Sequence, residues 1–383
     1  STCCSGDNTR RRPGNEMSNL KVIISGGGTG GHIFPALSIA GEIRRRFPES
    51  EILFVGAVGR MEMEKVPAAG FRIVGLPVIG FPRKPGINSL KFFIRLFQSM
   101  VKARRIIHEF KPHLAIGVGG YASGPVLMAA IARKIPALIQ EQNSFAGITN
   151  KLLAKKVQSV CVAYQGMERF FPKEKILLTG NPVRQNLLNI SASKEQALLN
   201  FNLPSGSKVV LITGGSLGAR SINNAVLNNL EQIRNSGIHY IWQTGSFYYE
   251  EMVAKTKDNL PGNVQIYKFL NNMELAYTAA DVVISRAGAG TISELCLVGK
   301  PTILVPSPNV AEDHQTRNAM ALVEKEAAVL VKDSTIDQEL FSQTLNLITD
   351  GKKMAKLEAN IKKLALPGAT GHIVDEALRI LKR

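Results

Sequence analysis

The chain has 383 residues, of which 45% are hydrophobic and 20% charged, and its mean hydropathy is +0.03. This composition excludes collagen-like, intrinsically disordered and disulfide-scaffold proteins, and the length suits about two globular domains. No apolar run reaches the roughly 18 residues that a membrane-spanning helix requires. The four cysteines form no C-x-x-C pair and no framework, so we expect a reducing, cytosolic compartment.

Residues 1–19 precede the first predicted element. They include Arg10, Arg11 and Arg12, but no apolar stretch follows these arginines, so the segment does not have the pattern of a secretory signal. We expect a disordered tail here, with Met17 as the natural start of the protein.

The net charge of +17 is distributed unevenly along the chain. Residues 20–180 carry 23 Lys and Arg against 9 Asp and Glu, a balance of +14, whereas residues 181–383 carry 21 against 19. A basic half attracts nucleic acid, an anionic membrane surface or an acidic substrate. Because the chain has no nucleic-acid-binding motif and no aromatic stacking platform, nucleic acid is not an expected partner.

Two similar segments lie about half the chain apart. KVIISGGGTGGH begins at Lys21 and KVVLITGGSLGAR begins at Lys208. Each is an apolar run rich in β-branched residues, followed by glycines and a helical pattern, which is typical of a buried parallel strand and its turn into a helix. The repetition predicts two α/β domains that begin with the same unit.

Further apolar runs predict the remaining strands of both sheets. In the first half they lie at 51–56, 113–118, 136–140 and 159–163, and in the second at 239–244, 264–267, 282–285, 302–305 and 328–331. Helical patterns alternate with these runs, as doubly wound parallel sheets require.

The domain boundaries follow from this pattern. We expect an N-terminal Rossmann-like domain at 20–180 and a C-terminal one at 181–370, with a link around 171–184 where prolines interrupt the pattern. Residues 371–383 form an amphipathic helix that is expected to pack on either domain, including back on the N-terminal one.

Four glycine-rich segments lie at 26–32, 119–125, 214–219 and 287–294. Glycine lets a helix N-terminus approach an anion or a sugar closely, although tight strand-to-helix turns need glycine in any case. Their presence in both halves favours a ligand-binding cleft between domains. The first segment matches G-x-G-x-x-G, but the second strand ends without an acidic residue and no P-loop lysine follows. We therefore expect neither a nicotinamide cofactor nor ATP-dependent phosphoryl transfer.

His32 follows the first glycine segment at the start of a predicted helix. It is a candidate general base or phosphate ligand, and the alternative is an ordinary residue of a first helical turn. The chain has no Asp-x-Asp motif and no His, Cys, Asp and Glu cluster with metal-ligand spacing, so no metal is expected. A diphosphate leaving group would instead be stabilised by helix N-termini, hydroxyls and cations, for which Ser216 and Arg184 are suitable.

The stretch 82–100 is a basic amphipathic pattern. Its apolar residues recur at helical spacing and cations surround them: Ile87, Leu90, Phe93, Ile94 and Phe97, with Arg83, Lys84, Lys91 and Arg95. Such a helix lies in a membrane interface or packs its apolar face into a core, and the stretch alone leaves both alternatives open.

Seven motifs together resemble the MurG family of bacterial glycosyltransferases, which add N-acetylglucosamine to undecaprenyl-diphospho-muramoyl-pentapeptide. They are GGGTGGHIFPALSIA from Gly26, GGYASGP from Gly119, EQNSFAGITNKLLA from Glu141, GNPVR from Gly180, GGSLGAR from Gly214, AGAGTISE from Ala287 and DHQTRNA from Asp313. They span nearly the whole chain from Lys21, in family order and spacing. The resemblance implies a GT-B fold, in which two Rossmann-like domains face a cleft and bind the acceptor and the donor respectively.

The resemblance also implies roles for individual residues. Thr29, Gly30 and Gly31 would face the donor sugar and the acceptor diphosphate, Asn143 the sugar, and Arg184 and Ser216 the nucleotide or its phosphates. Leu270 would hold the uracil through its backbone, Ala289, Gly290 and Thr291 would line the sugar-phosphate, Glu294 would bind the ribose hydroxyls and Gln315 a sugar hydroxyl. Three positions depart from the family pattern: Leu217 and His314 stand where glutamine occurs in relatives, and Gly290 is at a variable position.

The implied reaction is a single inverting displacement. The C4 hydroxyl of the muramoyl residue attacks the anomeric carbon of UDP-N-acetylglucosamine and UDP departs, with His32 as the expected base and Glu141 as a weaker candidate. UDP-N-acetylglucosamine is a substrate, and neither a cofactor nor a metal is expected.

A polyprenyl-linked acceptor implies a peripheral enzyme on the cytoplasmic face of the bacterial inner membrane. The basic stretch 82–100 would dock on the anionic leaflet, and other cell-wall synthesis proteins are candidate partners. Three alternatives stay open: a glycosyltransferase with a soluble acceptor, a GT-B-like UDP-sugar epimerase, and a non-catalytic basic binding protein.

Overall fold

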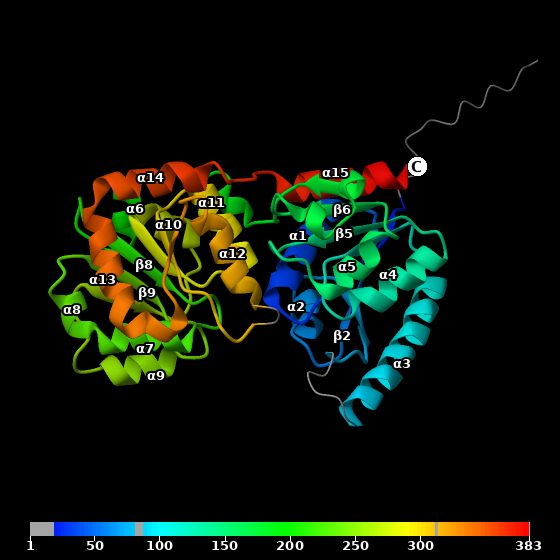
Figure 1. The fold of residues 1–383 in the computed structure, drawn as a ribbon, viewed down its shortest axis with the longest axis horizontal. Helices are drawn as coiled ribbons and strands as arrows, with labels where there is room; N and C mark the ends of the chain where they lie inside the picture. The colour runs from blue at the N-terminus through cyan, green and yellow to red at the C-terminus, as the bar shows by residue number, and fades with distance from the viewer. Residues whose placement is uncertain (1–18, 81–86, 311–312, 383) are drawn as a thin grey trace, which may run out of the picture. The chain divides into compact units, whose positions relative to one another are not determined.

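The computed structural model describes residues 19–80, 87–310 and 313–382, and these form two parallel β-sheets (Figure 1). The strand order is β3-β2-β1-β4-β5-β6-β7 in the first sheet and β10-β9-β8-β11-β12-β13 in the second. Most of the expected tail, together with Arg83, Lys84 and the side chain of Ile87, lies outside the part of the chain that is described.

The first sheet contains the four further strands predicted from apolar runs in this half. Its strands are β1 (Lys21–Ser25), β2 (Glu51–Ala57), β3 (Arg72–Leu76), β4 (Leu114–Gly117), β5 (Ala137–Glu141), β6 (Ser159–Val162) and β7 (Ile176–Leu178). Strand β1 lies at the centre, where Ile23 pairs with Leu53 of β2 and with Ala115 of β4. Strands β3 and β7 were not predicted, and β7 falls inside the proposed link at 171–184, which is therefore wrong in part because these residues pair with β6.

The helices of this half alternate with its strands. They are α1 (Gly30–Arg46), α2 (Glu62–Ala68), α3 (Ile87–Phe110), α4 (Ser123–Ala132) and α5 (Ile148–Ala154). The stretch that the sequence identified as amphipathic forms most of α3.

The second sheet confirms all the strands predicted for its half. Its strands are β8 (Val209–Thr213), β9 (His239–Gln243), β10 (Val264–Tyr267), β11 (Val282–Ser285), β12 (Thr302–Leu304) and β13 (Val329–Leu330). The helices are α6 (Lys194–Asn200), α7 (Arg220–Asn228), α8 (Leu230–Arg234), α9 (Tyr249–Thr256), α10 (Met273–Ala279), α11 (Ala289–Val298), α12 (His314–Val323), α13 (Ile336–Thr349), α14 (Gly351–Lys362) and α15 (Ala369–Leu381).

Both faces of the second sheet are buried. Alternate side chains of a strand point to opposite faces, and Leu211 packs in one apolar cluster with Ile241 while Ile212 packs in another with Trp242. This double burial explains why the strands are continuous apolar runs in the sequence, since a parallel sheet covered by helices on both sides has no polar face.

The chain divides into two compact units. One contains the described residues up to Gln140 together with 152–159 and 373–383, and the other contains 141–151 and 160–372. The boundary passes through β5, whereas the first sheet continues to β7, so the units do not coincide with the sheets. Most of α15 belongs to the first unit, where Asp375 forms an ion pair with Arg46 of α1. Within the described ranges no helix is both long and apolar enough to cross a bilayer.

The α1 helix offers a test of this ion-pair network. Glu42 accepts hydrogen bonds from Arg45 at 2.8 Å and Arg46 at 2.7 Å, and these partners, Arg45 first, lower its pKa from 4.5 to about 2. We expect Glu42→Gln to lower the free energy of unfolding by about 0.5–1 kcal/mol at pH 7, because the pairs are partly exposed. The folded-state pKa lies below the unfolded value, so this contribution is present above pH 4.5 and disappears as the pH falls toward 2.

Urea unfolding at pH 7, 4 and 2.5 measures this difference. The exposed Glu49, for which Glu49→Gln is the control, follows the same helix. A Glu42→Gln deficit that is the same at all three pH values would contradict the assignment.

Candidate active site

The four glycine-rich loops follow β1, β4, β8 and β11. Strands β1 and β4 are neighbours in the first sheet, β8 and β11 are neighbours in the second, and in each sheet the strand order reverses between them. Open α/β sheets bind ligands at the carboxyl ends of their strands at such a switch point. The fold therefore brings the loops together in two pairs, one in each sheet.

The first pair of loops packs backbone against backbone. A Cβ atom added at Gly120 would lie 2.4 Å from the carbonyl oxygen of Gly27, and one added at Gly26 would lie 2.9 Å from the carbonyl oxygen of Gly119. Gly120 also has a φ of +84°, which disfavours other residues. Only glycine fits at these contacts.

The first turn of α1 holds the predicted base. Thr29 precedes the helix in an extended conformation, and its Oγ1 lies 3.2 Å from Nδ1 of His32. When Nδ1 carries the ring proton and donates to Thr29, the lone pair resides on Nε2, where it can accept a proton from a substrate. The first N–H groups of an α-helix have no intrahelical acceptor. In α1 these are the N–H groups of Gly30 and Gly31, which can bind an anion.

Glu141 does not have the surroundings of a general base. Its side chain is 2% exposed, and its carboxylate accepts hydrogen bonds from Asn150 Nδ2 at 2.8 Å and from the N–H groups of Gly147 and Asn143, each at 3.1 Å. Burial raises the pKa of Glu141, and these donors act in the opposite direction. The carboxylate organises the segment 141–150, so the weaker candidate for the base is not supported.

Asn143 is oriented by α12. Its Oδ1 accepts a hydrogen bond from Asn318 Nδ2 at 3.0 Å, and Asn318 Oδ1 accepts one from the N–H group of Ser144 at 2.9 Å. Asn318 is fully buried. The side chain expected to contact a sugar is thus fixed by a residue 175 positions later in the chain.

The glycine loop after β8 packs closely against the segment that follows β9. A Cβ atom at Gly218 would lie 2.1 Å from the carbonyl oxygen of Thr244. Ser216 is exposed in this loop, and its carbonyl accepts the N–H group of Ser246 at 3.0 Å. Ser216 lies in the loop before the helix, since α7 begins at Arg220.

Gln243 links this loop to the predicted uracil site. Its Oε1 accepts the N–H group of Leu270 at 2.8 Å, and its Nε2 donates to Thr213 Oγ1 at 3.0 Å and to the Gly215 carbonyl at 3.2 Å. Gln243 is 1% exposed. Because the N–H group of Leu270 is bonded to Gln243, the implied contact with uracil falls to the carbonyl of Leu270.

Three predicted or neighbouring polar side chains form one network. Arg184 Nε lies 3.1 Å from Glu294 Oε1, and the Tyr277 hydroxyl donates to Glu294 Oε2 at 3.2 Å. Burial raises the pKa of Glu294, while Arg184 opposes this shift. The structure thus brings together the residue expected at the ribose and a residue expected at the phosphates.

The remaining predicted donor residues lie at two helix starts. Ala289, Gly290 and Thr291 form the first turn of α11. Gln315 lies in the first turn of α12, where its Oε1 accepts the N–H group of Ser307 at 2.9 Å. Leu217, which departs from the family pattern, is 64% exposed in its loop.

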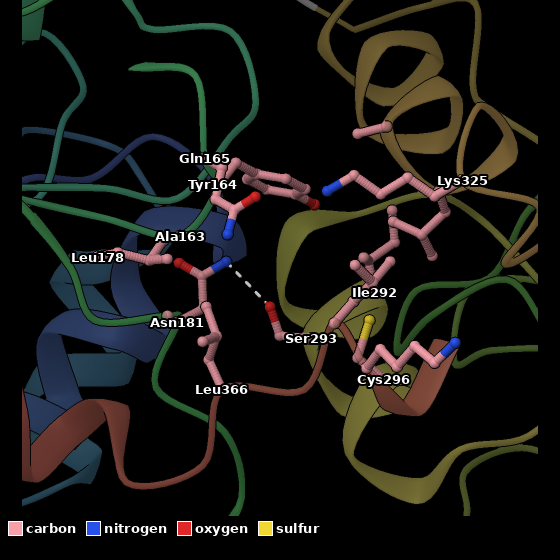
Figure 2. A pocket seen from close by; sticks show the side chains of 15 residues that line it. Ala163, Tyr164, Gln165, Leu178, Asn181, Ile292, Ser293, Cys296, Lys325 and Leu366 are labelled. Atoms are coloured by element: carbon pink, nitrogen blue, oxygen red, sulfur yellow. Dashed lines mark hydrogen bonds between the residues drawn. The ribbon is translucent and has the colours of Figure 1, made fainter. Parts of the chain in front are cut away.

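A pocket in the second unit is lined in part by α11 (Figure 2). It is lined by Ser293 and Cys296 of this helix, and Asn181 Nδ2 donates to Ser293 Oγ at 3.1 Å. Burial raises the pKa of Cys296 to about 12, which keeps the thiol protonated and unreactive. None of the predicted substrate residues lines this pocket, so it is distinct from the candidate site.

The apolar stripe of α3 is exposed. Leu90, Phe93, Ile94 and Phe97 are 64%, 59%, 49% and 69% exposed, and Val101 continues the stripe. Lys91 and Arg95 are exposed beside them. The alternative in which this face is core is therefore wrong, because the buried residues of the helix lie outside the stripe, among them Ser99, Ala103 and Ile106.

Two parallel α/β sheets with glycine loops at both switch points have the GT-B architecture. Family models for the N-terminal and C-terminal domains of glycosyltransferase family 28 match residues 22–162 and 209–370. The chain belongs to glycosyltransferase family 28.

Relatives and solved structures agree with this assignment. The chain is 54% identical to a protein of Parabacteroides distasonis, over 96% of this chain and 100% of that one, and 55% identical to one of Phocaeicola vulgatus, over 94% and 96%. Both are named UDP-N-acetylglucosamine–N-acetylmuramyl-(pentapeptide) pyrophosphoryl-undecaprenol N-acetylglucosamine transferase. The crystal structure of Acinetobacter baumannii MurG has a TM-score of 0.77 at 28% identity, over 94% of this chain and 99% of that chain.

Sequence reasoning missed the residues that hold the loops. Gln243, Asn318 and Glu62 are buried polar side chains, and Glu62 accepts the N–H group of Gly28 at 3.0 Å. Nothing local distinguishes Glu62 and Asn318, because their hydrogen-bond partners lie in other elements. A polar residue inside a predicted apolar segment, such as Gln243 at the end of a strand, is the one signal that was present.

Glu141 provides a test of a structural against a catalytic role. We expect Glu141→Gln to lower the free energy of unfolding by about 1–3 kcal/mol, because the amide NH2 group would face N–H donors that the carboxylate now accepts. Urea unfolding measures the change, with the exposed Glu168→Gln as control. Unchanged stability together with lost transferase activity would instead indicate a general base.

Proposed function

We propose that the protein transfers N-acetylglucosamine from UDP-N-acetylglucosamine to the C4 hydroxyl of the muramoyl residue of undecaprenyl-diphospho-muramoyl-pentapeptide. The names of relatives that are 54–55% identical over nearly the whole chain support this substrate pair. The observation that carries the chemistry is the Thr29–His32 contact in the first turn of α1.

The reaction is an inverting displacement at the anomeric carbon. Nε2 of His32 takes the proton of the C4 hydroxyl, the hydroxyl oxygen forms the new bond to the anomeric carbon, and the bond from that carbon to the diphosphate oxygen breaks. The electron pair of the broken bond remains on UDP. The Thr29 contact orients the imidazole, and with Thr29 accepting from Nδ1 the lone pair lies on Nε2, as this step needs.

The second unit supplies the donor-binding groups. The Glu294 carboxylate accepts the ribose hydroxyls, Leu270 contacts the uracil, and the N-terminus of α11 at Ala289 to Thr291 favours the charge that grows on the diphosphate. Arg184 and Ser216 add a cation and a hydroxyl for the phosphates, and Asn143 and Gln315 contact the sugar. We expect the reaction to proceed in EDTA, because helix N-termini and side chains take the place of a metal.

We propose further that the protein acts at the cytoplasmic face of the inner membrane. The stripe Leu90, Phe93, Ile94 and Phe97 offers exposed apolar side chains to the acyl boundary, and Lys91 and Arg95 are attracted by anionic lipids. A lipid-linked acceptor then reaches the first unit without leaving the bilayer.

Two other activities would need different observations. A UDP-sugar epimerase acts on the donor alone, and a glycosyltransferase with a soluble acceptor needs no membrane surface. Product analysis with the donor alone identifies the first, and transfer to a soluble acceptor without vesicle binding identifies the second.

His32 is the first residue to test. We expect His32→Ala to reduce transfer to a short-chain lipid-linked muramoyl-pentapeptide by about a hundredfold, because the attacking hydroxyl loses its base. Radiolabelled N-acetylglucosamine transfer in EDTA measures this loss, and UDP affinity should stay within twofold. His239→Ala, at the start of β9, is the control. A fully active His32→Ala enzyme places the base elsewhere, and no wild-type transfer overturns the proposed function.

The α3 stripe is tested by making it polar. We expect Phe93→Ser combined with Phe97→Ser to reduce binding to vesicles that contain phosphatidylglycerol, because both rings are exposed and their removal costs no core packing. Vesicle flotation measures binding, and UDP affinity should be unchanged. Leu199→Ser removes an equally exposed apolar side chain of the second unit and is the control. Unchanged flotation would reject the docking role.

A further inference from the structure

A buried carboxylate lies behind the first glycine loop. Glu62 begins α2 and is 0% exposed. Its Oε2 accepts the N–H group of Gly28 at 3.0 Å, and its Oε1 accepts the N–H group of Ala57 at 2.9 Å. One side chain therefore joins the loop after β1 to the last residue of β2.

The space around this carboxylate is shaped by glycine. A Cβ atom at Gly27 would lie 2.1 Å from Glu62 Oε1, and one at Gly56 would lie 2.5 Å from Glu62 Cγ. The two positions lie on neighbouring strands or their loops. The glycines of both segments thus make room for the Glu62 side chain, in addition to their role in the turn.

A charge at this depth needs a reason beyond stability. Burying a carboxylate costs free energy that its hydrogen bonds only partly return, and an apolar residue of similar volume is often as stable. A carboxylate, however, accepts hydrogen bonds on both oxygens and presents no donor of its own. Here each oxygen holds one N–H group, whereas the amide nitrogen of a glutamine in the same place would face one of these donors.

The loop has little else to fix it at this point. Gly28 has a φ of +91°, and no atom of the residues that the structure describes lies within 4 Å of the position that its Cβ would take. The hydrogen bond to Glu62 fixes the N–H group of Gly28 on its other side. The next residue is Thr29, whose Oγ1 contacts Nδ1 of His32 at 3.2 Å.

We propose that Glu62 is a positioning residue for the transfer reaction. By holding the N–H group of Gly28, it sets the place of Thr29 and through it the orientation of the His32 imidazole. It also occupies the Gly28 N–H group, so that the N–H groups of Gly30 and Gly31 are the ones directed at an anionic substrate. This inference rests on the proposed function, in which His32 is the base.

The test is Glu62→Gln in the full chain. We expect kcat/KM for the lipid-linked acceptor to fall about 10- to 100-fold, the scale of one lost hydrogen bond to a charged group. KM for UDP-N-acetylglucosamine should stay within twofold, because the residues expected to contact its uracil, ribose and phosphates belong to the other unit. In a His32→Ala background the same substitution should change the rate less than twofold, since Glu62 acts through His32.

Two controls separate positioning from general destabilisation. Glu42→Gln removes a paired carboxylate near the other end of α1 and should leave both KM values and kcat unchanged. Gly56→Ala keeps the Glu62 charge but displaces its side chain from a site within β2, and it should reproduce the Glu62→Gln pattern even if that variant folds poorly.

A readout independent of turnover keeps this inference distinct from the proposed function. The ¹⁵N resonances of the His32 ring, assigned by comparison with His32→Ala, report its tautomer and should change in Glu62→Gln whether or not the acceptor has been chosen correctly. Unchanged His32 resonances, or an equal loss of rate in the His32→Ala background, would overturn the positioning role. Absence of wild-type transfer would overturn the proposed function alone.

Discussion

Contact between backbone and backbone at the carboxyl ends of the central strands is the constraint on which the candidate site depends. Gly27 meets Gly120 in the first unit and Gly218 meets Thr244 in the second, at distances that leave no room for a Cβ atom. A helix N-terminus can approach an anion closely only where no side chain intervenes. The same lack of side chains, however, removes the packing contacts that fix an ordinary loop.

Buried polar side chains from other elements compensate for this lack. Glu62 holds the loop before α1, Gln243 holds the loop after β8, and Glu141 holds the segment that carries Asn143. Each makes several hydrogen bonds while almost fully buried, and a buried polar group is tolerated only while its partners are present. The glycine loops and their anchors are therefore interdependent, and the loss of one bond frees a loop rather than a single atom.

The sequence predicted the strands and glycine loops of the site, but not the buried polar side chains that hold the loops. The central strands were predictable because strands buried on both faces are continuous apolar runs, and the glycines mark the turns that follow them. The short edge strand β7 escaped, since Leu177 and Leu178 are 39% and 37% exposed and prolines flank the segment. Glu62 was not identifiable either: Glu64 stands two positions away in similar sequence and is exposed. Whether Glu62 or Glu64 is buried depends on how α2 packs against β1 and β2 in the folded protein, and no local sequence pattern indicates this packing.

The α3 helix shows the same limit in another form. Its apolar residues occupy two stripes about 100° apart around the helix. Phe92 and Leu96 are half-buried while Phe93 and Phe97 are exposed, so periodicity alone could not decide which stripe is core. An exposed apolar stripe whose surroundings carry no net charge favours self-association. Here the stripe lies within a segment whose balance is +14, so copies of the chain repel one another while an anionic surface attracts them. Under the proposed function, charge selects the surface and the apolar side chains provide the depth of insertion, and neither feature alone would give both.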